Sequence, residues 1–328
     1  MGIVGIVANP SSGKDIRRLV ARASVFDNQE KQAIVRRVLA GMVESGADKI
    51  AYFDDGHHIV RRALEECSAV IDAQAVDSTQ TATALDTITT ARAFKEIGCD
   101  VVITLGGDGT NRAFALGWRD APLIPISTGT NNVFPALVEA TIAGAAAGLI
   151  ACGAIGLNIV ANQHKIVQVI IDGEQDDLAL IDAVLSRERF VGARALLAPE
   201  QLEVALLTRA NPAAVGITAV GGLLSPISDR DDFGLLIEFG STGQIVNAPI
   251  APGYYRKIQV CKYRRVNPEE EILVEGPGVL ALDGERERVL KPGQIASLSI
   301  SRSGPKVVDL ERVMLIAAEQ RNFITEPD

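Results

Sequence analysis

Aromatic side chains are scarce in this 328-residue chain: they make up 4% of it, with a single Trp. The interior must therefore be built from Ala, Val, Ile and Leu, because hydrophobic residues together still reach 47%. Cysteine is also rare, and its occurrences lie far outside metal-ligand spacing of one another: Cys67, Cys99, Cys152 and Cys261. This pattern predicts small buried thiols in a reducing cytoplasm and argues against a disulfide scaffold or a zinc site.

Positive charge is in deficit, with 32 Lys and Arg against 41 Asp and Glu and a net charge of −9. Such a balance argues against a nucleic-acid-binding surface, but it leaves room for a local pocket around a small phosphorylated ligand. Long uncharged apolar runs are missing except over 141–160. That segment is rich in Gly and Ala, which predicts a helix packed closely on a sheet, then a turn and a strand, and not a membrane span. Because the chain opens directly into Ile3–Ala8 without a secretion signal, we expect a soluble protein.

Strand and helix signals alternate over the first 150 residues. This alternation predicts a parallel sheet with helices on its faces, a Rossmann-like three-layer α/β domain. The expected strands are Ile3–Ala8, Lys49–Phe53, Ala69–Val76, Val101–Leu105 and Leu123–Ile126. The expected helices are Ile16–Ala23, Gln29–Ser45, His57–Cys67, Thr81–Ile97 and Asn111–Trp118.

The pattern changes after residue 160, where short strand-like runs are separated by turn signals and not by helices. This predicts a mostly antiparallel β domain, followed by an amphipathic helix over Val308–Gln320 that returns to the first domain. We predict one domain of 1–150 plus 305–328 and a second of 151–304. The expected strands of the second are Lys165–Asp172, Leu178–Ser186, Gln201–Thr208, Gly216–Leu224, Gly234–Phe239, Lys257–Tyr263, Glu271–Val274, Val279–Leu282 and Ile295–Ile300.

The most informative segment is GGDGTN over 106–111, where a predicted buried strand ends and a predicted helix begins. Glycines let the backbone approach a ligand closely, and the start of the helix offers unpaired N–H groups to phosphate. A carboxylate repels phosphate, so Asp108 fits better if it holds Mg²⁺ beside the phosphates or takes a proton from an attacking hydroxyl. The alternative is a turn in which Asp or Thr caps the helix.

Two further polar loops follow strands. The first, NPSSGKD over 9–15, resembles a Walker loop superficially, but Ala8 and Asp15 stand where a glycine and the metal-binding Ser or Thr belong, which excludes a P-loop NTPase. It remains either a phosphate loop or a capped turn. The other, STGTNN over 127–132, carries amides suited to phosphate or ribose hydroxyls, or again forms a capping turn. All three loops leave the carboxyl ends of parallel strands, which predicts a common cleft for phosphates.

These motifs together resemble the superfamily that joins NAD kinases with diacylglycerol and sphingosine kinases. The chain shares with it N-P-x-S-G after the first strand, GGDGTN, and GTNN some twenty residues later. The runs APIAPG over 248–253 and LDGE over 282–285 resemble the tail of the same superfamily. Among its branches, the chain is most similar to the ATP-NAD kinase-like proteins of the acetoin catabolism protein X type.

The resemblance implies an N-terminal nucleotide-binding domain, a β-rich second domain for acceptor binding and self-association, and a cleft between them. It implies that Asp108 is the catalytic acid, with Mg²⁺ nearby. Asp283 and Glu285 are implied at the metal or phosphate edge, although Asp-Gly is also a common hairpin turn. The residues expected to bind the cofactor are Asn9, Ser12, Gly13, Gly106, Gly107, Gly109, Thr110, Asn111, Gly129, Thr130, Asn131, Asn132, Asp283 and Glu285.

The sequence also departs from NAD kinases. Their Asn-Glu pair and TGSTAY stretch are absent, and the nearest segments, Leu197–Glu203 and Gly240–Ile245, do not reproduce them. We therefore predict a kinase dependent on ATP and Mg²⁺ that phosphorylates a hydroxyl, with NAD(H) the first acceptor by resemblance. Another hydroxylated metabolite linked to acetoin catabolism, a lipid acceptor, and a non-catalytic ATP- or NAD-binding regulator remain as alternatives. We predict a homo-oligomer with no nucleic-acid or membrane partner.

Overall fold

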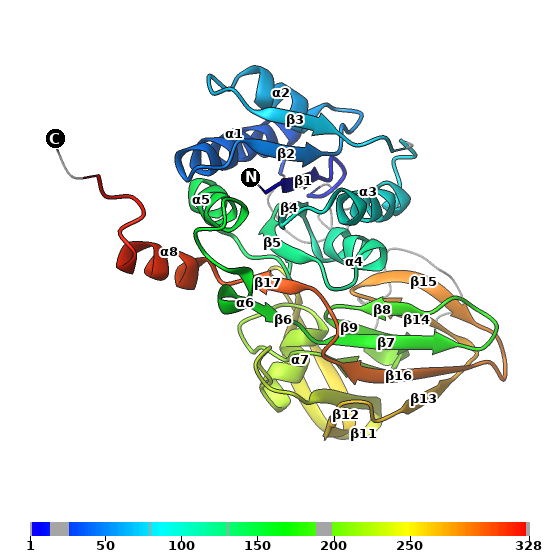
Figure 1. Cartoon of the computed structure of the whole chain (residues 1–328). Helices are drawn as coiled ribbons and strands as arrows, with labels where there is room; N and C mark the ends of the chain where they lie inside the picture. Colours follow the sequence, from blue (N-terminus) through cyan, green and yellow to red (C-terminus); the bar gives the residue numbers. More distant parts are fainter. Residues whose placement is uncertain (1, 14–25, 79, 130, 188–198, 326–328) are drawn as a thin grey trace.

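The first half of the chain forms a mostly parallel sheet between two layers of helices (Figure 1). The computed structural model describes residues 2–13, 26–78, 80–129, 131–187 and 199–325. In these residues the sheet order is β3-β2-β1-β4-β5-β17-β6. Its strands are β1 Val4–Ala8, β2 Lys49–Tyr52, β3 Asp72–Ala75, β4 Val101–Gly106, β5 Pro122–Ser127, β6 Ala161–Gln163 and β17 Lys306–Val308. The predicted α/β fold class is confirmed.

Successive side chains of the central strands point to opposite faces of the sheet, and each face is covered by its own layer of helices. In β4, Ile103 and Leu105 face the apolar cluster under α1 and α5, whereas Val102 faces the cluster under α3 and α4. Strands buried on both faces read as continuous apolar runs, and that is why these strands could be predicted. The helices are α1 Asn28–Glu44, α2 Ile59–Glu65, α3 Ala84–Ile97, α4 Asp108–Gly117, α5 Ala140–Ala151, α6 Leu157–Val160 and α8 Leu310–Glu319.

Helix α5 lies against α1 with almost no space between the two backbones. A Cβ on Gly144 would stand 2.0 Å from the carbonyl oxygen of Val38, and one on Gly41 would stand 2.0 Å from that of Thr141. The small residues of this segment therefore serve close helix packing, as predicted, but on a helix as well as on the sheet. No helix among the described residues is long and apolar enough to cross a membrane.

The second half of the chain contains two antiparallel sheets packed face to face. A six-stranded sheet runs β12-β11-β10-β9-β14-β15 and a four-stranded sheet runs β13-β16-β7-β8 in the described residues. One apolar cluster fills the space between them, with Val169, Leu280 and Leu298 among its members. The strands are β7 Ile166–Ile171, β8 Asp177–Ala179, β9 Asp182–Ser186, β10 Leu202–Leu207, β11 Gly234–Ala251, β12 Tyr254–Val266, β13 Ile272–Glu275, β14 Gly278–Leu282, β15 Glu285–Leu290 and β16 Ile295–Ser301. The predicted β-rich second half is confirmed.

The predicted strand Gly216–Leu224 is wrong, because this segment forms helix α7 (Ile217–Leu224). A short apolar run does not distinguish a strand from a buried helix. Gly216 has a φ of 83°, which turns the chain into the helix. A Cβ on Gly221 would lie 2.9 Å from Leu207, so α7 approaches the six-stranded sheet closely enough to cover its outer face.

Other elements differ from the prediction in their extent. Strand β11 does not end at Phe239 as predicted but continues to Ala251, with a bulge at which both Phe239 and Gln244 pair with Val260. The run Leu178–Ser186 divides into β8 and β9, because the chain passes there from one sheet to the other. The expected helix Ile16–Ala23 lies outside the described residues.

The chain returns to the first sheet near its end. Strand β17, which was not predicted, pairs in parallel with β5 and antiparallel with β6. Helix α8 then packs against α5 through Val313 and Ala317. Figure 1 shows this last helix beside α5 and α6, on the opposite side of the molecule from α3 and α4.

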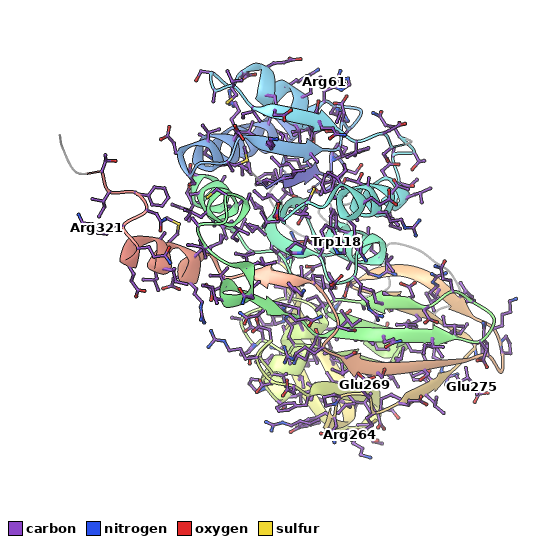
Figure 2. The ribbon with its side chains drawn as sticks, viewed as in Figure 1. Arg61, Trp118, Arg264, Glu269, Glu275 and Arg321 are labelled. Carbon is purple, nitrogen blue, oxygen red and sulfur yellow. The ribbon has the colours of Figure 1, made fainter. Side chains whose placement is uncertain are left out.

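A mixed apolar and ionic contact joins the two halves. The cluster under α3 and α4 also contains Ile166 and Leu180 of the second half, and Trp118 packs at its edge, where α4 ends (Figure 2). Beside it, the buried Arg112 of α4 donates to the Asp177 carboxylate at 2.7 Å, and Arg288 donates to the same carboxylate at 2.7 Å. The start of α4 is thereby held against the second half of the chain.

Candidate active site

The three polar loops meet at one edge of the parallel sheet, as their positions after β1, β4 and β5 predict. The amide of Asn9 donates to the Leu105 carbonyl at 3.0 Å, and its side-chain Nδ2 donates to Thr110 Oγ1 at 2.9 Å. Ser12 Oγ lies 2.7 Å from Thr128 Oγ1, which joins the first loop to the third. These contacts fix three segments that are distant in sequence as one surface.

A buried lysine holds the first of these loops. Lys31 of α1 is 0% exposed, and its Nζ donates to the carbonyl oxygens of Ser12 at 2.7 Å, Asn9 at 2.9 Å and Pro10 at 3.2 Å. An ammonium group has three protons to donate, and burying one is costly unless acceptors surround it. The loop carbonyls therefore turn inward toward Lys31, and this lysine was not predicted as part of the site.

Asp108 is the first residue of α4 and is half-buried. Its Oδ1 accepts hydrogen bonds from the amides of Phe134 at 2.8 Å and Val133 at 3.0 Å, and its Oδ2 accepts from the Val133 amide at 3.1 Å. A carboxylate offers about four acceptor positions, so it can accept from several donors at once. The third loop thus orients the Asp108 carboxylate at the edge where the loops meet.

Three glycines allow the close approach of neighbouring segments around Asp108. A Cβ on Gly107 would lie 2.8 Å from Asn132 Oδ1, and a Cβ on Gly13 would lie 2.7 Å from the Thr128 carbonyl. A Cβ on Gly109 would lie 2.1 Å from Glu285 Oε1. The exposed Glu285, from the start of β15, therefore reaches across to the first turn of α4 from the second half of the chain.

Asp283 lies on the side of the site that the second half of the chain forms. This side is called the second-half wall here and comprises Arg209, Asp283 and Glu285. Its carboxylate is buried and accepts hydrogen bonds from the amides of Ile181 at 2.7 Å, Leu180 at 2.8 Å and Asp182 at 3.2 Å. Burial raises the pKa of the Asp283 carboxyl to about 6, and the nearby charge of Asp108 acts in the same direction. Asp283 therefore joins the β14–β15 turn to the 180–182 segment and lies within electrostatic range of Asp108.

Arg209, two residues after the end of β10, connects the second-half wall to the third loop. Its Nη1 donates to the Val133 carbonyl at 3.2 Å, and its guanidinium lies 5.9 Å from the centre of the Phe134 ring. Its Nη2 donates to His164 Nδ1 at 2.9 Å. Burial lowers the pKa of the Arg209 guanidinium, while the carboxylates of Asp108, Asp229 and Asp283 oppose that shift.

The bond from Arg209 determines the state of His164. Because an arginine only donates, His164 Nδ1 must accept, and the neutral ring carries its proton on Nε2, which faces Asp229 Oδ2 at 3.8 Å. Burial lowers the pKa of His164 to about 4. The neighbouring charges of Arg209, Arg302 and Lys165 lower this pKa further, while that of Asp229 raises it. His164 is thus a neutral acceptor that holds one side of the Arg209 guanidinium.

The remaining predicted residues lie around the same edge in different environments. Asn132 Nδ2 donates to Ser127 Oγ at 2.8 Å, while Gly129 and Asn131 are partly exposed in the same loop. Asn111 is 0% exposed and joins α4 to β4, since its Oδ1 accepts from Thr104 Oγ1 at 2.6 Å. Gly106, with Thr110 packed against it, ends β4. Thr130 lies outside the described residues.

Metal-ligating clusters are absent from the part of the chain that the structure describes, where no group of three or more His, Cys, Asp or Glu side chains could hold an ion. The polar turn Asp54–His58, which could have suggested a metal site, instead caps α2. The Asp55 carboxylate accepts from the amides of His57 at 2.8 Å and Ile59 at 3.0 Å.

Comparison with known proteins assigns both halves of the chain. Residues 4–155 match the model of the ATP-NAD kinase N-terminal domain, and residues 165–303 match that of the acetoin catabolism protein X C-terminal domain. The acetoin catabolism protein X of Cupriavidus necator is 34% identical over 95% of this chain and 91% of its own length. The chain belongs to the acetoin catabolism protein X family. The resemblance noted in the sequence is confirmed.

Solved structures of more distant relatives show the same fold. The yeast NADH kinase in complex with NADH matches with a TM-score of 0.57 and 13% identity, covering 100% of this chain and 89% of its own. A Bacillus anthracis protein assigned as a diacylglycerol kinase matches with a TM-score of 0.52 and 13% identity, covering 93% of this chain and 96% of its own. The family therefore has a kinase-type fold, with an α/β domain followed by antiparallel sheets.

Proposed function

We propose that this protein is a kinase that transfers the terminal phosphoryl group of ATP to a hydroxyl of a small molecule. The observation that carries the proposal is the Asp108 carboxylate, half-buried at the first turn of α4 and oriented by the amides of Val133 and Phe134. It lies where three glycine-bearing loops meet. Asp55, by contrast, accepts from amides beside its own helix α2.

The first turn of α4 suits the phosphates of a nucleotide. The first backbone N–H groups of a helix have no partner within it, and they carry the positive end of the helix dipole. In α4 these groups belong to Asp108, Gly109 and Thr110, and the preceding Gly107 has no side chain to cap them. Because Gly107 and Gly109 lack a Cβ, Asn132 and Glu285 can pack directly against this turn, beside the N–H groups that a phosphate would meet.

Asp108 would act on the acceptor. A carboxylate within hydrogen-bond reach of a hydroxyl orients it and takes its proton as the bond to phosphorus forms. The two amides hold this carboxylate still, so its acceptor oxygen keeps one direction. The backbone N–H groups of α4 would meanwhile stabilise the negative charge that develops on the transferred group.

Magnesium fits this site only in part. The described residues contain no three-ligand cluster, whereas Mg²⁺ on a nucleotide usually keeps several waters and takes one or two carboxylates in addition to the phosphates. Asp108 and Glu285, at the same turn, are the carboxylates that would hold it. When bound, the ion neutralises charge on the β- and γ-phosphates.

NAD(H) is the first acceptor to test, because residues 4–155 match the ATP-NAD kinase domain and the yeast NADH kinase shares the fold. A hydroxylated metabolite related to acetoin is the second, since it follows the name of the family.

The experiment incubates the purified protein with Mg²⁺ and ATP labelled in the γ-phosphate, together with NAD, NADH, short diols or diacylglycerol. Label transferred to one acceptor class supports the kinase. Tight ATP binding with no transfer to any class would instead indicate a non-catalytic nucleotide-binding regulator.

A further inference from the structure

Asp108 depends on a segment that has no regular secondary structure of its own. Val133 and Phe134, whose amides hold the carboxylate, lie between β5 and α5 in neither a helix nor a strand. A loop amide keeps its direction only if other contacts fix its peptide plane. The geometry of Asp108 therefore depends on whatever holds this pair of residues.

Arg209 supplies such contacts at the peptide that links the two residues, which carries the Val133 carbonyl and the Phe134 N–H. Its Nη1 donates to the carbonyl of Val133, and its guanidinium lies against the ring of the buried Phe134. The planar guanidinium can do both at once because its donors form a fixed fork. The same ring also meets His164 edge-on, with 5.5 Å between the ring centres.

Arg209 is itself fixed from the second half of the chain. His164 Nδ1 accepts from its Nη2, and Thr208 anchors the end of β10, donating from Oγ1 to the Leu180 carbonyl at 2.7 Å. His164 in turn is held by its own backbone, whose amide donates to the Pro305 carbonyl at 2.8 Å. A continuous set of contacts thus runs from the second half of the chain to Asp108.

We propose that Arg209 is a positioning residue for the phosphoryl transfer: it holds the Val133–Phe134 amides that orient the Asp108 carboxylate. This inference rests on the proposed function, since it assigns Arg209 an effect on the reaction through Asp108. It also has a part that does not depend on catalysis, namely that Arg209 protects the two amides. The residue contacts neither nucleotide nor acceptor in this account.

The test compares Arg209→Gln and Arg209→Lys with the wild-type protein. Gln removes the fork and the charge, whereas Lys keeps the charge but cannot bond Val133 and His164 in the same arrangement. We expect kcat to fall on the order of 10- to 100-fold in Arg209→Gln and less in Arg209→Lys, because small misplacements of a catalytic group are costly. The dissociation constant of ATP should stay within about twofold, since the loops of the first half are unchanged.

A matched control is Arg302→Gln. Arg302 is also a partly buried arginine of the second half. It donates to the Asp231 carbonyl at 2.8 Å and to the Gln163 carbonyl, beside His164, at 3.0 Å, and its bonds in the described residues do not go to the 133–134 segment. Its replacement should leave kcat close to the wild-type value. Melting temperatures of all variants, measured by circular dichroism, show which proteins are folded; if Arg209→Gln does not fold, Arg209→Lys carries the test.

Two readouts separate positioning from general stability. In the Asp108→Asn background, Arg209→Gln should cause no further loss of kcat, because residues that act through one group are not additive. Amide hydrogen exchange at Val133 and Phe134 should accelerate in Arg209→Gln and not in Arg302→Gln. Unchanged exchange, or faster exchange with unchanged kcat, would overturn the inference. If the wild-type protein transfers no phosphate at all, the proposed function fails and takes the role in the reaction with it, while the exchange data still decide whether Arg209 fixes the loop.

Discussion

The two sides of the candidate site are built in different ways. On the first-half side, three short loops present backbone groups, and their glycines lie where a Cβ would collide with a neighbour. On the second-half side, charged side chains from separate strands form the surface: Arg209 after β10, Asp283 after β14 and Glu285 at the start of β15. The residues of the first side stand in short sequence motifs, whereas those of the second side lie far apart in the sequence and come together only in the folded chain.

The two sides of the site come from segments that match two different domain models. The loop edge depends on glycines and chain direction, which are common to phosphate-binding sites at the ends of parallel strands. The opposite side depends instead on single charged side chains from separate strands. The separate matches of residues 4–155 and 165–303 follow the same division.

The largest effect is expected where the two sides are joined. Arg112→Met leaves the buried Asp177 with less compensation, so we expect a loss of about 3 kcal/mol in the free energy of unfolding. The matched variant Arg288→Met removes the other arginine from the same carboxylate, but its side chain is 34% exposed. It should cost about 1 kcal/mol. Urea denaturation measures both, and equal losses would show that burial does not decide the strength of this network.

The second-half wall should also give the protein a pH dependence through His164. Its folded pKa of about 4 lies below the ordinary histidine value of 6.5, so the neutral ring contributes stability above pH 6.5 that is lost as the pH falls toward 4. In His164→Gln, the drop in the free energy of unfolding between pH 6.5 and pH 4 should be smaller than in the wild type by about 2 kcal/mol. The raised pKa of Asp283 acts with the opposite sign, but it is present in both proteins and cancels in the difference.

The measurement is the free energy of unfolding of wild-type protein and His164→Gln at several pH values from 4 to 7. A difference between the two that does not change with pH would contradict a neutral, buried His164. Arg302→Gln is not a suitable control here, because the Arg302 charge itself acts on His164. An exposed substitution such as Lys291→Gln is suitable and should leave the pH profile unchanged.

The smallest change in stability is expected at the loop edge. In Gly109→Ala the new Cβ meets only the end of the flexible, exposed Glu285, so the free energy of unfolding should change by less than about 1 kcal/mol. Phosphoryl transfer should nevertheless fall, because the Cβ enters the space beside the first turn of α4. In the control Gly144→Ala the Cβ meets the backbone of Val38, which should cost about 1–3 kcal/mol without a specific effect on ATP binding.

The loop-edge side of the site could be predicted because its signals are local. An apolar strand followed by glycines and short polar residues shows both the element and its end, and parallel strands bring such ends together. Lys31 and Arg209 could not be predicted, because each is one of many basic residues until the fold surrounds it with carbonyls. Helix α7 was mistaken for a strand, and β17 was missed, because three residues next to Pro305 carry too little pattern to indicate pairing.

The most direct test of the central claim is the kcat of Asp108→Asn with the best acceptor found. Asn preserves the size of the side chain but cannot take a proton, so we predict a loss on the order of 10²- to 10⁴-fold, with the affinity for ATP retained. Asp55→Asn serves as the control, since Asp55 also accepts from two backbone amides but lies at α2. An Asp108→Asn protein that turns over at close to the wild-type rate would remove Asp108 from the chemistry and contradict the account.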